Sequence, residues 1–390
     1  MNRDLLLLAL SLMTWGVGEG MFYYFQPLYL EQLGADPVKI GGVLGLVGLV
    51  MTLAYLPAGY LSDRLGRRPL LIFAWVLGAL ATVLMALASH FYVFVAGMLL
   101  YGLTAFVSVP LNSYTTAARG RWSVGRALTL ISASFSVGMI AGPIIGGWIG
   151  QEYGLQANFK LAPFLFVIST GLILFIRPQP VEHSAENEAW ARLNGLLSGR
   201  FTGFLVLVFL LMFGMYLPQP LTQNFLQNVR QVNLMQIGQL ISARSLGVVA
   251  LNLVLGHLNA RLGLLLAQGG VALFSLLIWR GSGLPVYMLG YFLLGGYVTA
   301  RSLVFAQTRA LVQARQMGLA YGLVETANSL AIVIGPPIAG YLYKLQPTLI
   351  YPGAIVLILV GLAANLWLSP VRIKDLSAFE EKERAEWTPS

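Results

Sequence analysis

The sequence predicts an all-α membrane protein whose twelve transmembrane helices form two similar halves of six helices each. The first observation is composition: of 390 residues, 57% are hydrophobic and 10% are charged, whereas soluble proteins carry about 25% charged residues. The second is that apolar runs of membrane-spanning length, about 20 residues each, follow one another with short polar connections. The third is an internal repeat that relates the first half of the chain to the second.

The apolar runs define twelve elements in chain order. We expect helices over residues 5–28, 38–61, 69–88, 92–115, 126–149, 160–176, 202–226, 235–256, 262–279, 284–307, 319–343 and 349–368. A polar, proline-containing stretch at 177–201 is interpreted as a cytoplasmic linker between a first half at 1–176 and a second half at 202–369. The charged residues 370–390 are expected to form a cytoplasmic tail.

The distribution of charge orients these helices. Most of the 24 Lys and Arg residues lie in alternate loops, and such residues collect on the cytoplasmic side of a membrane. We therefore expect a multi-pass protein of the cell inner (plasma) membrane with both termini in the cytoplasm. The net charge of +9 follows from this bias, so we predict no nucleic-acid partner. The chain has no cysteine, and its three histidines lie near helix ends or in loops, so we predict no metal and no other cofactor.

Two pairs of landmarks carry the internal repeat. Gly142-Pro143 in the fifth predicted helix is matched by Gly335-Pro336 in the eleventh, 193 residues later. The residues around Gly66 are matched by those around Gly263, 197 residues later. Parallel repeats of this kind occur in membrane transporters, so we predict two pseudo-symmetric halves.

A short charged loop follows the second predicted helix. It reads GYLSDRLGRR over residues 59–68 and resembles the Gly-x-Leu-x-Asp-Arg-x-Gly-Arg-Arg/Lys signature of the major facilitator superfamily. Together with the repeat, the resemblance covers essentially the whole chain. It implies the major facilitator fold and transport by alternating access. We expect a cytoplasmic gate formed by Gly59, Asp63, Arg64, Gly66, Arg67, Arg68 and Glu325.

The fifth predicted helix carries a second signature. Its segment GMIAGPIIGG at residues 138–147 resembles the Gly-x-x-x-Gly-Pro-x-x-Gly-Gly pattern of the twelve-helix drug/proton antiporter branch. Small residues four positions apart let helices approach closely, and proline permits bending. A purely structural use of the pattern is the alternative. The predicted helix-packing residues are Gly138, Gly142, Pro143, Gly146, Gly147, Gly335 and Pro336.

The fourth predicted helix departs from the antiporter pattern. Drug exporters of this branch usually carry an arginine there, whereas this helix has no charged residue. Polar side chains recur instead at helical spacing. We expect this stripe to face a wet cavity, and polar contact between helices is the alternative. The stripe comprises Tyr101, Thr104, Ser108, Asn112 and Thr115, and the first four are predicted to line the cavity.

Four ionisable residues lie well inside predicted helices, where such residues are costly and mark functional sites. Glu19 and Arg244 are each nine residues from the expected outer surface, or about 13 Å at 1.5 Å per residue. Arg301 and Glu325 are each six residues from the expected inner surface, or about 9 Å. Depth therefore predicts two pairs, Glu19 with Arg244 for proton coupling and Arg301 with Glu325 toward the cytoplasm.

The remaining candidates are aromatic and amide side chains that share a helix face with Glu19 or occupy facing helices. The resemblance places the first helix, and by the repeat the seventh, along a central cavity. An interfacial aromatic belt is the alternative for some of these rings. The predicted cavity residues beyond the stripe are Trp15, Phe22, Tyr23, Gln26, Tyr216, Gln219, Gln223, Tyr297 and Arg301.

These features favour a secondary transporter of a small organic molecule, amphipathic or charged, that works as a proton-coupled antiporter in efflux. Proton-coupled uptake of an organic anion is the alternative, motivated by Arg244 and Arg301. A membrane receptor or sensor on a transporter scaffold is an alternative of another class. No pattern of a catalytic site is apparent, so we do not expect an enzyme. The predicted partners are the lipid bilayer, the substrate and protons, and we expect a monomer.

Overall fold

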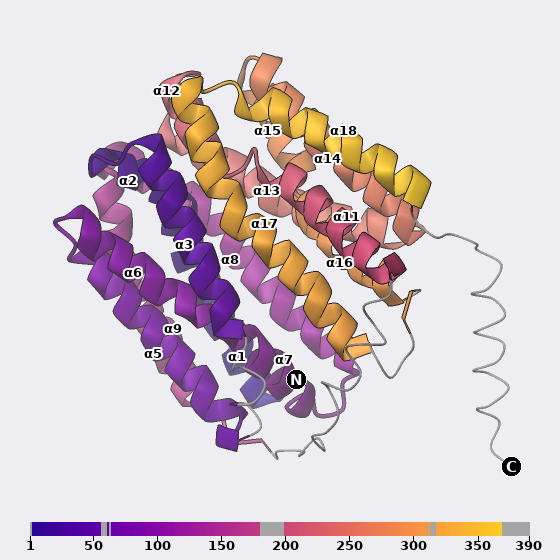
Figure 1. The fold of residues 1–390 in the computed structure, drawn as a ribbon. Coiled ribbons are helices and arrows are strands. Elements are labelled where there is room, and N and C mark those ends of the chain that lie inside the picture. Colours follow the sequence, from indigo (N-terminus) through magenta and orange to yellow (C-terminus); the bar gives the residue numbers. More distant parts are fainter. Residues whose placement is uncertain are drawn as a thin grey trace, which may run out of the picture.

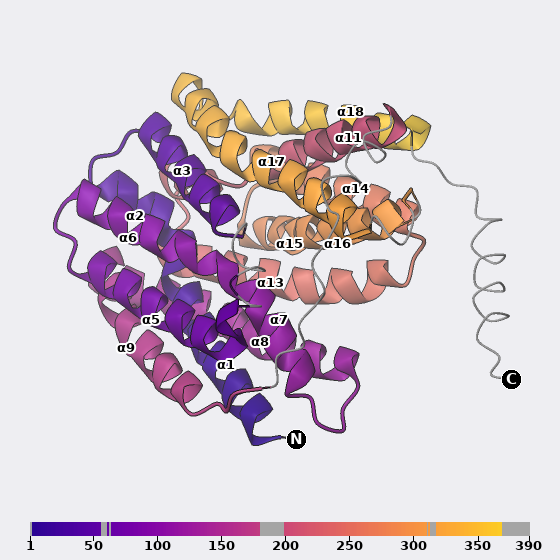
Figure 2. The same cartoon turned by 60° about the horizontal axis from the view of Figure 1, so that its bottom comes forward.

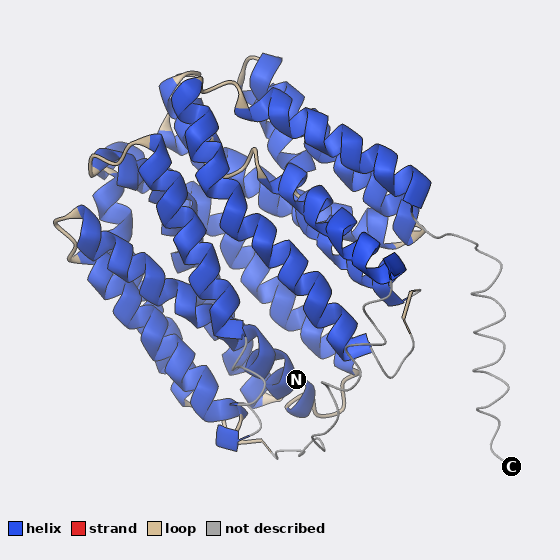
Figure 3. Ribbon diagram, in the orientation of Figure 1, coloured by secondary structure: helices blue, strands red, loops and turns tan. Residues whose placement is uncertain are grey.

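The structure is a computed structural model that describes residues 2–55, 61, 64–179, 199–309, 311–312 and 317–368. Every regular element in these ranges is helical (Figures 1 and 3). Ten helices are long and apolar enough to cross a membrane, and two shorter apolar helices, Phe201–Tyr216 and Ile350–Leu366, complete the set of twelve. The predicted all-α membrane fold is confirmed. Most of the predicted linker and all of the tail lie outside the described residues.

The elements follow the chain in two groups. The N-terminal half contains α1 (Arg3–Phe22), η1 (Tyr23–Phe25), α2 (Gln26–Gln32), α3 (Pro37–Tyr55), α5 (Arg67–Ala86), α6 (Phe91–Leu103), η2 (Thr104–Val107), α7 (Ser108–Ala117), α8 (Val124–Tyr153) and α9 (Leu155–Leu174). The C-terminal half contains α11 (Gly199–Tyr216), α12 (Thr222–Asn228), α13 (Leu234–Gly256), α14 (Ala260–Arg280), α15 (Leu284–Leu294), α16 (Gly296–Arg309), α17 (Met317–Leu345) and α18 (Ile350–Leu368).

Several predicted helices are interrupted, and most of the breaks have a local cause. The helix expected at 202–226 divides into α11 and α12 because Pro218 and Pro220 supply no N–H groups. Pro110 likewise removes a bond to the preceding turn, and the short 3₁₀ segment η2 lies there between α6 and α7. α15 and α16 meet at Gly295, where an added Cβ would lie 2.4 Å from the backbone of Gly247. A glycine is needed at this approach.

The two halves lie side by side, with the N-terminal half in indigo to magenta and the C-terminal half in rose through orange to yellow (Figures 1 and 2). Inside the first half α1 packs on α8 and α9, and α5 packs on α9 and α6. Inside the second, α14 packs on α15, α16 and α18. The halves meet along two helix pairs, α3 with α17 and α8 with α13.

These two pairs are pseudo-equivalent, as the internal repeat predicts. A Cβ on Gly238 of α13 would lie 2.2 Å from the carbonyl oxygen of Pro143 in α8. A Cβ on Gly41 of α3 would lie 2.2 Å from the carbonyl oxygen of Pro336 in α17. Gly147 contacts the start of α13, and Gly340 contacts the start of α3 in the same way. We call these two contacts the glycine seams.

The fifth-helix signature serves two interfaces at once. An added Cβ on Gly138, Gly142 or Gly146 would lie 2.3–2.4 Å from a backbone carbonyl oxygen of α1. Gly147 faces the other half instead, 2.6 Å from the carbonyl oxygen of Leu234. A Cβ added at Gly335 would lie 3.0 Å from the Tyr216 ring. The motif therefore fixes α8 against its own half and against α13.

A polar contact also joins the halves on the face away from the chain termini, which we call the far side; the opposite face is the terminus side. Glu31 at the end of α2 accepts hydrogen bonds from the side-chain amides of Asn224 and Asn228 on α12, the latter at 2.7 Å. Gln151 accepts a hydrogen bond from the backbone of Leu234 at 3.1 Å. The contacts of Glu31 with the two asparagines are called the far-side clasp. With the glycine seams, they close the halves together at this face.

Candidate functional site

A cavity of about 350 Å³ lies among α1, α3, α6, α7 and α8 of the N-terminal half. Its lining runs from Gln26 to Asn112 and Leu128, which lie close to the terminus-side ends of α7 and α8. The walls are mostly apolar and aromatic. A cavity of this size and character is suited to a small organic molecule.

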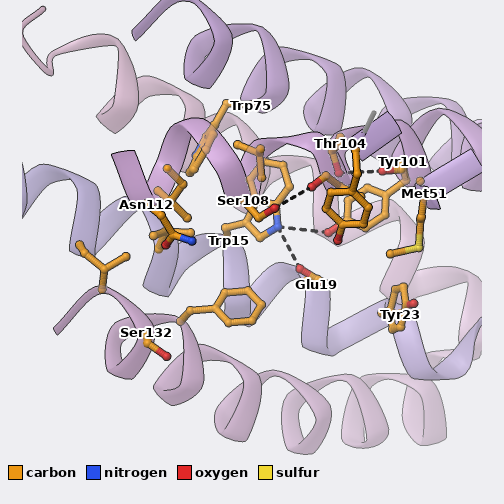
Figure 4. Close-up of a pocket in the computed structure, with 18 of the residues that line it drawn as sticks. Trp15, Glu19, Tyr23, Met51, Trp75, Tyr101, Thr104, Ser108, Asn112 and Ser132 are labelled. Atoms are coloured by element: carbon orange, nitrogen blue, oxygen red, sulfur yellow. Dashed lines mark hydrogen bonds between the residues drawn. The ribbon is translucent and has the colours of Figure 1, made fainter. Parts of the chain in front are cut away.

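Glu19 is the one charged residue among the described residues that line this first cavity. Its Oε2 accepts a hydrogen bond from the Trp15 indole N–H at 3.0 Å. The same N–H lies 3.1 Å from the Tyr101 hydroxyl (Figure 4). Trp15 packs against Phe166, with ring centroids 4.4 Å apart. Aromatic packing thus positions the donor that holds the carboxylate.

The predicted polar stripe follows the cavity wall, and Tyr101, Thr104, Ser108 and Asn112 all line it (Figure 4). Two of its hydroxyls are bound to the local backbone, with Thr104 donating to the Tyr101 carbonyl at 2.7 Å and Ser108 to the Ala105 carbonyl at 3.4 Å. Asn112 of α7 is exposed and lines the cavity. The Tyr101 hydroxyl is engaged by Trp15 and Glu19, so Asn112 is the group of the stripe best placed to meet a ligand.

A second cavity of about 240 Å³ lies between the two halves, nearer the far side. Arg244 is its one charged lining residue within the described chain. The Arg244 Nη2 donates to Gln219 Oε1 at 3.2 Å, and the guanidinium carbon lies 5.3 Å from the centre of the Tyr24 ring. In the part of the chain that the structure describes, its Nε is buried without a hydrogen-bond partner, as is Oε1 of Gln223. This cavity thus contains unsatisfied polar groups around a cation.

The predicted pairing of Glu19 with Arg244 is wrong in this conformation. In the described parts of the chain the two side chains form no ion pair, because Glu19 is held by Trp15 and Arg244 by Gln219. Tyr23 lines the boundary between the two cavities and is shared by both. The hydrogen bond of each residue stays within its own half, although the Arg244 guanidinium also lies over the Tyr24 ring of the other half.

The predicted pairing of Arg301 with Glu325 is confirmed. Arg301 Nε donates to Glu325 Oε2 at 3.2 Å, and Arg301 Nη2 donates to Oε1. The side chains are 41% and 27% exposed, so water weakens the attraction. Both belong to the C-terminal half, on α16 and α17, and neither lines the two cavities described above. A role in gating stays a prediction.

Two other predicted cavity residues lie elsewhere. Phe22 is fully buried and packs against Tyr101 and Phe166 inside the N-terminal half. Tyr297 is 7% exposed, packs near Tyr216 with ring centroids 5.7 Å apart, and donates to Asn328 Oδ1 at 3.4 Å. Helical spacing placed both side chains near the cavity face, but neighbouring helices cover them.

The remaining predicted cavity residues divide between the two spaces. Trp15 lines the first cavity, Tyr23 and Gln26 line both, and Tyr216, Gln219 and Gln223 line the second. Our sequence reasoning missed Met51, which lines both. It also missed Tyr55 and Ser132 of the first cavity. A helix of mixed apolar residues, such as α3, gives no periodic polar signal that would have indicated them.

The predicted cytoplasmic gate is described only in part. Gly59 and Asp63 lie outside the described residues, Arg64 begins the described segment before α5, and Arg67 is the first residue of α5. Gly66 has φ of 81°, a backbone conformation that favours glycine. Arg68 Nε donates to the Ile176 carbonyl at 2.7 Å and Nη2 to the Leu174 carbonyl at 3.1 Å. Arg68 thus binds carbonyl groups at the end of α9.

The comparisons with known proteins agree with this architecture. The profile of the Major Facilitator Superfamily matches residues 7–263 and 204–389, which together span nearly the whole chain. The chain belongs to the Major Facilitator Superfamily.

Individual members of this superfamily are similar over different lengths. The tetracycline resistance protein, class E, of Escherichia coli is 26% identical over 88% of this chain and 89% of its own length. An uncharacterized MFS-type transporter of Methanocaldococcus jannaschii, MJ1560, is 23% identical, but the match covers 48% of this chain and 49% of that protein. The chain therefore spans about half the length of that relative.

Among solved structures, a mutant form of the nucleoside transporter NupG superposes with a TM-score of 0.82. The match covers 95% of this chain and all of that chain at 14% identity. At this identity the likeness establishes the fold alone. Substrate and coupling have to be argued from the residues of this chain.

Proposed function

We propose that this protein is a secondary transporter that exports a small organic molecule in exchange for protons by alternating access. The observation that carries the proposal is Glu19, an intramembrane acid on the wall of an aromatic cavity, with no cation beside it among the described lining residues. Carboxylates in such positions serve proton relays in transporters. The resistance function named for the class E relative also favours export.

The positions of charge and contact suggest the orientation. The bias of Lys and Arg puts the terminus side in the cytoplasm. With the far-side clasp and the glycine seams closed, the first cavity extends toward that side. We infer from this arrangement an inward-facing conformation, in which a monomer in the cell inner membrane would take substrate from the cytoplasm.

Competition for one carboxylate provides the coupling. A proton neutralises Glu19, and so does a cationic group of the substrate placed against it. Since both occupy the same oxygen atoms, binding of substrate releases the proton and binding of the proton releases substrate. A cycle that alternates these two loads between the two faces is an antiport.

A gradient experiment tests this mechanism. Purified protein in liposomes with an acidic lumen receives external tetracycline or uridine, the two substrate classes named among its relatives. We expect accumulation of at least one compound with a rise in lumen pH, and loss of that accumulation in Glu19→Gln. Exchange of compound across the membrane without a pH difference persists in Glu19→Gln, because glutamine resembles the protonated acid.

The matched control is Glu152→Gln, which removes an exposed carboxylate near the far-side end of α8. We expect this variant to transport like the parent protein. Gradient-driven accumulation by Glu19→Gln, or movement of neither compound by the parent protein, would contradict the proposal.

Uptake of an organic anion with a proton is a second candidate function, and Arg244 favours it. Its Nε is buried without a partner from the described chain, in a cavity between the halves, and guanidinium groups bind carboxylates through two hydrogen bonds. The same liposomes distinguish the two functions. A symporter accumulates its substrate only when the outside is the more acidic compartment.

A further inference from the structure

We propose that the two cavities form one binding site for an elongated amphoteric molecule, with its cationic group at Glu19 and its anionic group at Arg244. This inference rests on the proposed function and adds the class of substrate. It also gives a physical reason for two opposite charges that share a chamber without contacting each other.

The two cavities are adjoining parts of one space. Tyr23, Gln26, Val47 and Met51 line both of them. Their volumes of about 350 and 240 Å³ together lie within the range of sites for drug-sized ligands. A molecule that extends from one to the other passes between the side chains of η1 and α2 on one side and those of α3 on the other.

One end of this space accepts positive charge. Glu19 is the one charged lining residue of the first cavity among those described, and its hydrogen-bond partners are neutral, the Trp15 indole and the Tyr101 hydroxyl. Burying a carboxylate without a cation or several donors is costly. A cationic group of a ligand at this end removes that cost.

The other end accepts negative charge. A guanidinium carries five N–H donors; Arg244 donates to Gln219 through Nη2, whereas its Nε is buried without a partner from the described chain. The Tyr291 hydroxyl, in a side chain 1% exposed, also lacks a partner there. Gln223, 8% exposed, has an unpartnered Oε1 in the same cavity. Buried polar groups are normally satisfied, and a ligand carboxylate or phosphate supplies the acceptors for the first two.

The spacing from α1 into η1 indicates the length of the ligand. Tyr24 of η1, whose ring contacts the Arg244 guanidinium, follows Glu19 by five residues, an axial distance of about 8 Å at 1.5 Å per residue in the α-helix and 2.0 Å in the 3₁₀ turn. An α-amino acid carries both charges on one carbon and cannot reach both ends. The Tyr23, Tyr24 and Tyr216 rings between or beside the two ends favour a flat aromatic body.

Because Glu19 lies in one half and Arg244 in the other, such a ligand contacts both halves at once. A ligand with a single charge satisfies one residue and leaves the other unpaired. The site therefore selects for both charges together, and it couples ligand binding to the relative position of the halves.

Binding at equilibrium tests the inference without any gradient. The probes are 4-(aminomethyl)benzoate, with its charges at opposite ends of a ring, its isomer phenylglycine, with both charges on one carbon, and the singly charged benzylamine and benzoate. Dissociation constants are measured by ligand-observed NMR on the purified protein. We expect 4-(aminomethyl)benzoate to bind about tenfold more tightly than each of the other three, as one additional charge-assisted contact implies.

Substitutions assign the two ends. Glu19→Gln should weaken the binding of 4-(aminomethyl)benzoate about tenfold and leave the affinity for benzoate unchanged. Arg244→Gln should weaken the binding of 4-(aminomethyl)benzoate by a similar factor and leave the affinity for benzylamine unchanged. Arg244→Lys, which keeps the charge, should retain part of the affinity and shows that the site is folded. Glu152→Gln and Arg280→Gln are the controls, since their side chains lie outside both cavities.

The inference would be overturned if phenylglycine or a singly charged probe bound as tightly as 4-(aminomethyl)benzoate. It would also be overturned if no probe bound at millimolar concentration. None of these results affects gradient-driven transport by the parent protein, so the proposed function is judged separately. Conversely, tight binding of the amphoteric probe without proton-driven transport would support the site and contradict the antiport.

Discussion

At the residue scale, the hydrogen bonding of Glu19 in the first cavity depends on how the Trp15 side chain is packed. Trp15 lies between Phe166 and Trp75, with ring centroids 4.4 and 5.0 Å away. Gly78 of α5 lies against its ring edge, where an added Cβ would be 2.3 Å from the Trp15 Cη2 atom. Only this packing directs the indole N–H to Glu19 and Tyr101.

Gly78→Ala should therefore lower the free energy of unfolding by about 1–3 kcal/mol, because the methyl group overpacks the core. It should also weaken binding at the Glu19 end of the cavity by displacing the indole. Thermal unfolding in detergent and the benzylamine affinity measure these effects. The control is Gly171→Ala in α9, where an added Cβ meets nothing within 4 Å; similar behaviour of the two variants would contradict the argument.

At the element scale, α8 and α17 determine how the halves approach. Each carries a glycine-proline segment that meets a glycine at the start of a helix in the other half. The contacts of Gly238 with Pro143 and of Gly41 with Pro336 are equivalent under the internal repeat. Backbone contact of this kind requires glycine, since any side chain forces the helices apart.

Gly238→Ala and Gly41→Ala should each favour a state with the far side open. The chain has no cysteine, so Ser132→Cys in the first cavity is a unique reporter. Labelling of this cysteine by a membrane-impermeant maleimide from the terminus side should fall in both glycine variants. Gly42→Ala, with nothing within 4 Å of the added Cβ, is the control, and labelling equal to that control would show that the seams do not set the equilibrium.

At the scale of the whole molecule, the two halves are held together at the far side, and the first cavity extends toward the terminus side. The far-side clasp joins α2 to α12 through one carboxylate and two amides. Hydrogen bonds to a charged acceptor contribute about 1.5–3 kcal/mol each when buried. Glu31 is exposed, so its contribution is smaller, and it stabilises the closed far side.

Glu31→Ala should therefore shift the population toward far-side opening with little loss of folding stability. Gln223→Cys at the far end of the second cavity reports the change, and its labelling from the far side should rise several-fold. Gln32→Ala, a neighbouring exposed residue, should leave labelling unchanged. No difference between the two variants would mean that the clasp does not hold this face closed.

The sequence by itself determined the number, order and approximate bounds of the helices and the repeat of the halves. It also determined that Arg301 and Glu325 pair. The length of an apolar run, the position of a helix-breaking residue and the depth of a residue along a helix are local properties. They can be predicted from the spacing of residues in the sequence. The glycine-proline repeat likewise indicated close helix contact, because few residues permit it.

Only the tertiary structure decided which side chains meet around the cavities. Glu19 and Arg244 were expected at similar depth, yet Trp15 and Gln219 hold them apart. Phe22 shares a helix face with Glu19 but is covered by Tyr101 and Phe166. The rotation of a helix about its axis, and the approach of residues far apart in the chain, depend on the packing of the whole bundle. The depth of a residue in the membrane can therefore be predicted from its position in one helix, whereas its contacts depend on the packing of all twelve helices.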